Sequence, residues 1–301
     1  MTPARRAPFH RRVAGARWRA VKSSFGFFER LGVHVSPVHY YEPIPDTRTL
    51  DAATWTRRSD LPGVDLNVTG QLALLEELAE YREEFARFPL SSGGGPGRYH
   101  VDNASFEGGD GDALYAILRH LRPGRVVEIG SGFSTLLAAE ALAANGTGEL
   151  TAIDPFPSPV LRADPPGLSL IESPVQRVPM DTFTRLRAGD VLFIDSSHVL
   201  AIGSDVQHEF LEILPRLAPG VLVHVHDVFL PGEYPREIVL GKRFFWTEQY
   251  LLQAFLAFNR AFEVVLAMAW LHERHPDRLE AAFAAYRRDR YLPGSFWMRR
   301  A

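Results

Sequence analysis

Short apolar runs alternate with segments of helical spacing over the C-terminal two-thirds of the chain. A run such as Val191-Leu192-Phe193-Ile194 indicates a buried strand. Strands that alternate with helices predict a parallel sheet with right-handed crossovers, whose ligands collect at the carboxyl ends of the strands. The predicted strands are 125–129, 149–153, 168–171, 191–194, 221–225, 262–267 and 295–299, and the predicted helices are 133–144, 175–187, 204–217, 247–259 and 277–289.

The N-terminal third of the chain has a different pattern. Leu72, Leu75, Leu78 and Phe85 fall at helical spacing and predict a helix over residues 69–88, and a second helix is expected at 110–120. The glycine-rich stretch 91–97 between them predicts a linker or a lid hinge. We therefore expect three parts, namely a mobile basic arm at 1–19, an N-terminal extension or lid at 20–109 and a ligand-binding α/β domain at 110–301.

Composition excludes several kinds of partner and site. The 33 Lys and Arg residues are outnumbered by 36 Asp and Glu residues, and the net charge of −3 supplies no general field that would attract a nucleic-acid backbone. The absence of cysteine excludes disulfides and thiolate metal sites and fits a cytoplasmic protein. No apolar run approaches the roughly 20 residues that span a bilayer. We therefore expect neither a nucleic-acid nor a membrane partner.

A glycine turn follows the first predicted strand of the sheet. Gly130 and Gly132 lie in a tight strand-to-helix connection, where a ligand can approach the backbone and the N–H groups of the next helix. Asp154 ends the next strand, 22 residues after Gly132, at the position from which a carboxylate reaches both hydroxyls of a ribose. An adenosine ligand follows from this pair of signals. We expect Gly130→Val to abolish its binding with little loss of folded protein.

Glu128 precedes this turn inside an apolar strand. A buried acid costs several kcal/mol, on the order of the penalty for an unpaired polar group, unless it gains partners. We therefore expect Glu128 to face donors in the ligand pocket, while a role in packing alone is the alternative.

The stretch Glu128-Ile129-Gly130-Ser131-Gly132, together with Asp154, resembles the class I S-adenosylmethionine-dependent methyltransferases. The resemblance implies a doubly wound, Rossmann-like sheet of seven strands with an antiparallel last strand. It also implies S-adenosylmethionine as cofactor, with its methionine part at the glycine turn. Segment 246–250 (WTEQY) is similar to a bacterial branch of the same family. The cofactor residues expected from the resemblance and the turn are Glu128, Gly130, Ser131, Gly132, Ser134, Asp154 and Ser173, the last near the adenine.

Two loops at the carboxyl ends of the fourth and fifth strands carry the candidate chemistry. Asp195 and His198 lie in one loop and His226 and Asp227 in the other, and both open on the same crevice. A neutral histidine can deprotonate an acceptor hydroxyl near pH 7, and we expect His198 to be this base, assisted by Asp195. A histidine with only a local hydrogen bond, and an aspartate that only caps a helix, are the alternatives.

A divalent cation would acidify the same hydroxyl, and Asp195, His226 and Asp227 offer ligands that suit Mg²⁺ or Mn²⁺. The Asp-x-x-His sequence of the first loop resembles that of metal-dependent sugar and natural-product O-methyltransferases, in which the Asp binds metal and the His is the base. Those enzymes have an acidic pair after the fifth strand, whereas this chain has His226 at the first of these positions.

Other side chains near these loops are expected to shape the site. Strand alternation leads us to expect His224 on the face opposite to His226, in a structural role. Selectivity is expected from segment 231–236 and from aromatic or amide side chains that wall the pocket, with a place in the core as the commoner alternative. These side chains are Tyr99, Asn103, Phe106 and Trp246.

The function predicted from these observations is O-methylation of a small hydroxylated molecule, such as a sugar or a secondary metabolite. One alternative is an NAD-dependent oxidoreductase, which is disfavoured because Thr135 replaces the third small residue of the dinucleotide turn. Another is a non-catalytic module that binds S-adenosylmethionine. The predicted partner is a small-molecule acceptor, and the chain can also form a homo-oligomer.

Overall fold

The computed structural model describes residues 9–92, 97–162 and 167–301. The chain divides into two compact units. The first contains residues 1–54 and 237–245, and the second contains residues 55–236 and 246–301. The predicted hinge at 91–97 lies largely outside the described residues, since 93–96 are not among them.

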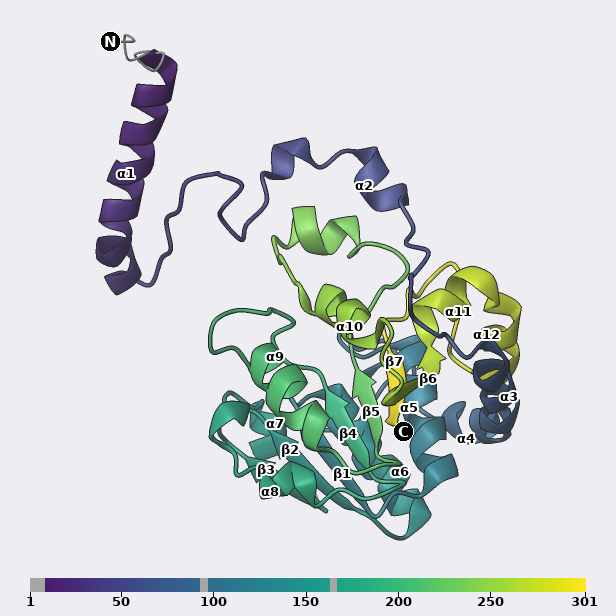
Figure 1. Cartoon of the computed structure of the whole chain (residues 1–301). Helices are drawn as coiled ribbons and strands as arrows, with labels where there is room; N and C mark the ends of the chain where they lie inside the picture. Colours follow the sequence, from purple (N-terminus) through teal and green to yellow (C-terminus); the bar gives the residue numbers. More distant parts are fainter. Residues whose placement is uncertain (1–8, 93–96, 163–166) are drawn as a thin grey trace. The chain divides into compact units, whose positions relative to one another are not determined.

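A seven-stranded sheet forms the centre of the second unit, with strand order β3-β2-β1-β4-β5-β7-β6 (Figure 1). Strands β1 to β5 are parallel, and β7 is antiparallel to both β5 and β6. The predicted doubly wound sheet with an antiparallel last strand is therefore confirmed. The strands are β1 (Arg125–Ile129), β2 (Glu149–Ile153), β3 (Leu168–Ile171), β4 (Val191–Ile194), β5 (Leu222–Val225), β6 (Phe262–Ala267) and β7 (Phe296–Arg300).

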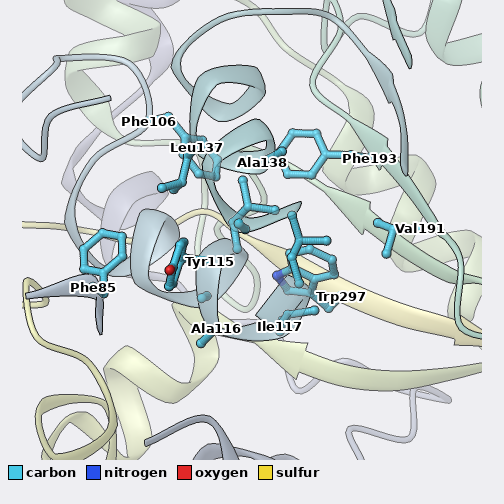
Figure 2. Packing of buried hydrophobic residues seen from close by; sticks show 14 of the residues in the cluster. Phe85, Phe106, Tyr115, Ala116, Ile117, Leu137, Ala138, Val191, Phe193 and Trp297 are labelled. Atoms are coloured by element: carbon cyan, nitrogen blue, oxygen red, sulfur yellow. The ribbon is translucent and has the colours of Figure 1, made fainter. Parts of the chain in front are cut away.

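Each central strand is buried on both faces and contributes alternate residues to two separate cores. Val191 and Phe193 of β4 join one core, whereas Leu192 and Ile194 join the other. This period of two explains why the strands read as continuous apolar runs. Figure 2 shows the first core, where α5 and α6 meet the sheet through side chains that include Tyr115, Ile117, Leu137, Ala138 and Trp297.

The α-helices of the second unit are α3 (Val68–Leu78), α4 (Arg82–Phe85), α5 (Gly108–Leu121), α6 (Phe133–Asn145), α7 (Pro159–Arg162), α8 (Asp181–Thr184), α9 (Asp205–His208), α10 (Glu248–Leu256), α11 (Met268–Arg274) and α12 (Pro276–Ala282), while α2 (Ala52–Thr56) spans the boundary between the units.

Several predicted helices are wrong as continuous elements: 69–88 is divided by a 3-10 turn at Ala79–Tyr81, and 277–289 is helical only over Pro276–Ala282. Over 175–187 the chain forms the 3-10 turn Val175–Arg177 and the single turn α8, because Pro179 interrupts the backbone hydrogen bonds between them. Over 204–217 it passes from α9 through the π-helical turn Glu209–Ile213 to a 3-10 turn at Leu214–Arg216, where Pro215 lacks a donor.

The first unit contains the helix α1 (Phe9–Arg30). Residues 9–19 of the predicted basic arm are thus the start of a helix, while residues 1–8 lie outside the described part of the chain. Lys22 forms an ion pair with Glu42, and Phe25 stacks on His34. Between residues 18 and 54 none of the described side chains is buried. No helix among the described residues combines the length and apolar content needed to cross a membrane.

Candidate functional site

The turn after β1 packs directly against the end of β4. Gly130 has a φ of +94°, and its N–H donates to the carbonyl of Ile153 at 2.9 Å. A Cβ atom added at Gly130 would lie 2.0 Å from the carbonyl oxygen of Asp195. The turn therefore needs glycine for the fold as well as for any ligand. The expectation that Gly130→Val stays well folded is accordingly wrong. Gly132, by contrast, is extended and has open space where a Cβ would be.

A cavity of about 500 Å³ lies at the carboxyl ends of β1, β2 and β4. Asp154 lines it, and the carboxylate accepts hydrogen bonds from Ser131 Oγ at 2.6 Å and from the N–H of Phe156 at 2.7 Å. These bonds fix the carboxylate at the cavity wall. The cavity is also lined by Ile129, Gly130, Ser131, Ile153, Pro155, Phe156, Pro174, Val175, Gln176, Asp195, Ser196, Ser197, Ser204 and Asp205.

A second cavity of about 500 Å³ is lined by the start of α6. Gly132 and Ser134 line only this cavity, whereas Ser131 and Asp195 line both. Phe106 contributes an apolar wall. The structure thus distributes the predicted cofactor residues over two neighbouring spaces that share Ser131 and Asp195.

Two predicted cofactor residues line neither cavity. Glu128 is buried, and its carboxyl accepts a hydrogen bond from Ser134 Oγ at 2.5 Å, so its donor is a residue of α6. Its Oε2 has no hydrogen-bond partner among the described residues. Burial raises the pKa of Glu128 to about 8, which leaves the acid mostly protonated at pH 7. Ser173 donates to the carbonyl of Pro174, and the lining at this position comes from Pro174 to Gln176 instead.

The two predicted loops do meet, and they bring two carboxylates and two imidazoles together. His198 Nε2 lies 3.3 Å from Asp195 Oδ1 and 3.5 Å from Asp227 Oδ2. His226 Nδ1 lies 3.4 Å from the same atom of Asp195 and 3.9 Å from that of Asp227. Both His198 and Asp227 have left-handed backbone conformations, with φ values of 60° and 54°. Such conformations in non-glycine residues are often retained at functional sites.

Ion pairing sets the charge of this cluster. Although burial opposes the charged imidazole, hydrogen bonds to Asp195 and Glu248 raise the pKa of His198 to about 10. The pKa of His226 is also raised, because the charges of Asp195 and Asp227 outweigh its burial. Burial favours a neutral Asp195, but the two imidazoles hold the pKa of its carboxyl well below the usual range. At neutral pH, both imidazoles are therefore protonated and Asp195 is ionised.

Two further acids contact the imidazoles, and the sequence did not single them out. Glu248 Oε2 lies 2.9 Å from His198 Nδ1 and Asp110 Oδ2 lies 3.7 Å from His226 Nε2. Asp110 also accepts hydrogen bonds from the N–H groups of Gly294 and Ser295. Glu248 lies in segment 246–250, so the family similarity of that segment could have identified it as a functional residue. No sequence pattern indicated Asp110.

Of the predicted metal ligands, Asp195 and Asp227 pair with the protonated rings of His198 and His226. No group of three or more His, Asp or Glu side chains in the described ranges has a geometry that could hold a metal ion. A protonated imidazole has no lone pair for a cation, so His226 would have to lose its proton before it could act as a ligand. We derive no catalytic step through a metal.

The expected orientation of His224 is wrong. Residues two apart on a strand point to the same face, and the rings of His224 and His226 are stacked with centroids 5.7 Å apart. His224 is completely buried, lies face to face on Phe193 and approaches Ser295 Oγ with its Nε2 at 3.0 Å. Burial lowers its pKa, so His224 is a neutral packing residue.

Only two of the four expected wall residues lie near the site. Phe106 lines the second cavity, and the ring of Trp246 lies 4.6 Å from that of His198. Tyr99 is instead a core residue whose hydroxyl donates to the carbonyl of Phe106. The amide of Asn103 donates to the same carbonyl, so these two side chains hold the loop that presents Phe106.

The chain is similar to a known protein family and to several known proteins. Residues 127–228 match a family model described as a methyltransferase domain. An uncharacterized protein from Archaeoglobus fulgidus is 35% identical over 169 residues, which cover 52% of this chain and 75% of the relative. Similar solved structures include the O-methyltransferase TomG from Streptomyces achromogenes, involved in tomaymycin synthesis, in complex with SAM (17% identity, 75% of this chain and 89% of that chain, TM-score 0.39). Another is the O-methyltransferase from Bacillus cereus in complex with SAH (12% identity, 76% and 91%, TM-score 0.38).

Proposed function

Because the chain belongs to the class I S-adenosylmethionine-dependent methyltransferases, we propose that it methylates a hydroxyl oxygen of a small molecule. The observation that carries this proposal is the cluster of Asp195, His198, His226 and Asp227 beside two cavities that share Asp195. A volume of about 500 Å³ suits a small ligand. A sugar or a secondary-metabolite scaffold is the proposed acceptor class. The cytoplasmic location and the homo-oligomer stay predictions.

We place the cofactor across the glycine turn. Asp154 and Ser131 supply hydrogen-bonding groups for the ribose in the first cavity, and the open space above Gly132 leaves room for the methionine part beside Ser134. The carboxyl of Glu128 accepts a hydrogen bond from the Ser134 hydroxyl through Oε1 and can hold that hydroxyl in place. When bound, S-adenosylmethionine supplies an electrophilic methyl group on a sulfonium.

Replacing Asp154 with alanine is expected to weaken S-adenosylmethionine binding by roughly 10- to 150-fold, because a hydrogen bond to a charged group is worth roughly 1.5–3 kcal/mol. Calorimetric titration measures this change. Asp181→Ala, which removes an exposed carboxylate of α8, is the matched control and should bind as the parent does. Equal affinity in Asp154→Ala would show that the ribose is held elsewhere.

His198 is the proposed acceptor of the hydroxyl proton as the oxygen attacks the methyl carbon. Its Nε2 faces Asp195 and Asp227, and its Nδ1 faces Glu248. Because the carboxylates keep a proton on the ring at pH 7, only a small fraction of His198 is available as a base there. Nε2 must therefore lose its proton before it can accept the proton of the acceptor hydroxyl.

Turnover is therefore expected to rise with pH, by about tenfold per pH unit from pH 7 to 9, and to level off near the folded-state pKa of about 10. The sign follows from the raised pKa, since the basic form appears only as the pH passes through it. The ion pairs of His198 add stability that is fully present below its unfolded-state pKa of about 6.5. This stability is lost as the pH rises toward the folded-state pKa. A pH profile of kcat measures the first effect. A profile flat between pH 7 and 9 would contradict it.

A divalent cation at Asp195, His226 and Asp227 is a further proposal, supported by a ring nitrogen of His226 that lies 3.4 Å from an oxygen of Asp195 and 3.9 Å from an oxygen of Asp227. Binding there would require His226 to lose its proton. The same kcat profile is measured after chelation and with added Mg²⁺ or Mn²⁺. The proposal is supported if the cation shifts the rise of kcat to lower pH. Carboxylates that bind the cation would stabilise the protonated imidazole less, which lowers the pKa of the base. Coincident profiles would reject it.

The proposed reaction is tested by incubating the full chain with S-adenosylmethionine and a panel of sugars and phenolic or alcoholic metabolites. Formation of S-adenosylhomocysteine that depends on an acceptor, with the methyl group on oxygen by mass spectrometry and NMR, is the expected result. Transfer only to nitrogen or carbon would contradict O-methylation. Binding of S-adenosylmethionine without turnover on any acceptor would favour a binding module.

A further inference from the structure

We propose that segment 246–250 is a clamp that holds both loops of the reaction centre, and that its Glu248 is the positioning residue for His198. This proposal rests on the proposed function, in which His198 accepts the proton. The segment lies at the start of α10, about 50 residues from His198 in the sequence. The family similarity of this segment gave its residues no individual roles, whereas their contacts in the folded chain give each of them one.

The first half of the clamp, residues 246–248, holds the backbone of the loop after β4, which contains His198. The carbonyl oxygen of His198 accepts hydrogen bonds from the N–H groups of Thr247 at 2.9 Å and of Glu248 at 3.1 Å. Thr247 Oγ1 accepts a third bond from the N–H of Leu200 at 2.7 Å. These three bonds flank the left-handed conformation of His198 and offset its cost.

The side chains of the same half orient the imidazole. Glu248 Oε2 lies 2.9 Å from His198 Nδ1, and Glu248 is buried, with 1% of the residue exposed. A buried carboxylate accepts the proton of Nδ1, which fixes the ring so that Nε2 points to Asp195 and Asp227. The ring of Trp246 closes one side of the imidazole at 4.6 Å. Glu248 therefore acts on the reaction only through His198.

The second half of the clamp holds the β5 loop. Gln249 is buried, its Oε1 accepts the N–H of Phe229 at 3.0 Å, and its own N–H donates to Tyr234 Oη at 2.9 Å. The hydroxyl of Tyr250 donates to Glu233. This segment thus connects the loop that contains His198 to the loop that follows Asp227. It therefore keeps His198 and Asp227 at a fixed distance from each other.

Glu248→Gln tests this role with almost no change in shape. The introduced amide can donate its NH₂ group to Nδ1, and the neutral ring then keeps its proton on Nε2. That nitrogen can no longer accept the hydroxyl proton, so kcat is expected to fall by roughly 10²-fold or more. The affinity for S-adenosylmethionine should stay within about twofold. Glu209→Gln is the control for the hydrogen bond itself, because Glu209 is an equally buried acid whose charge also interacts with Glu248 and His198 but whose hydrogen bond comes from Ser196.

Two further measurements separate positioning from a structural effect. If Glu248 acts only through His198, the double variant Glu248→Gln with His198→Ala has the same kcat as His198→Ala alone. The ¹H–¹⁵N correlation of His198 Nδ1 should be protected from solvent exchange in the parent and in Glu209→Gln, and lost or displaced in Glu248→Gln. This NMR measurement on the parent needs no turnover and no variant that folds.

An unprotected Nδ1 proton in the parent, or an unchanged correlation in Glu248→Gln, overturns the positioning role. So does a double variant that is more than about tenfold slower than His198→Ala, because Glu248 would then act independently. If His198→Ala turns over as the parent does while the Nδ1 proton is protected by Glu248, the base assignment of the proposed function fails and the contact itself stands.

Discussion

Replacing His198 with alanine lowers turnover by roughly 10² to 10⁴-fold and leaves the affinity for S-adenosylmethionine almost unchanged, because a general base acts on the acceptor hydroxyl and not on the cofactor. The loss corresponds to roughly 3–5 kcal/mol of transition-state stabilisation. The structure supports the separation of the two effects, since His198 lines neither cavity while Asp195, its partner, lines both.

Single-turnover kinetics and calorimetric titration measure these two quantities. His120→Ala is a matched control, because His120 lies at the end of α5 and pairs only with Glu77 among the ion pairs of the described residues. It should change neither quantity. Equal turnover by the parent and His198→Ala over the whole pH range would reject His198 as the base.

Gly130→Val is expected to damage the fold itself. The φ of +94° costs a β-branched residue about 1–2 kcal/mol, and the overlap with the carbonyl of Asp195 adds roughly 1–3 kcal/mol. The melting temperature should therefore fall by about 5 to 15 °C, and S-adenosylmethionine should no longer stabilise the protein. Differential scanning calorimetry with and without the cofactor measures both effects.

The control for this variant is Gly132→Ala in the same turn. Gly132 has an extended backbone and no atom within 4 Å of the position that a Cβ would take, so this variant should melt within about 2 °C of the parent. Its methyl group would enter the second cavity, and we expect weaker cofactor binding. A Gly130→Val protein that melts as the parent does would show that the end of β4 can move away from the turn.

Local pattern alone determined much of the fold. The bounds of β1, β2, β3, β4 and β6 agree with the predicted ranges, because each strand is a short, mostly apolar run bounded by polar or turn residues. The glycine turn and Asp154 were identified for the same reason, since their chemistry depends on the spacing between adjacent elements. The interrupted segments 175–187 and 204–217 were missed because the apolar spacing continues past Pro179 and Pro215, where the helical hydrogen bonds are interrupted.

Tertiary structure alone decided which groups meet and what charge they have. Glu248 reaches His198 across 50 residues, and Asp110 reaches His226 from a helix that precedes the whole sheet, separations that no local spacing encodes. The sequence predicted a neutral His198 because an isolated imidazole has a pKa of about 6.5. Burial between Asp195 and Glu248 reverses that expectation, since charge depends on the neighbours that the fold supplies. The requirement for glycine at Gly130 likewise comes from the carbonyl of Asp195, which only the pairing of β1 with β4 brings into contact.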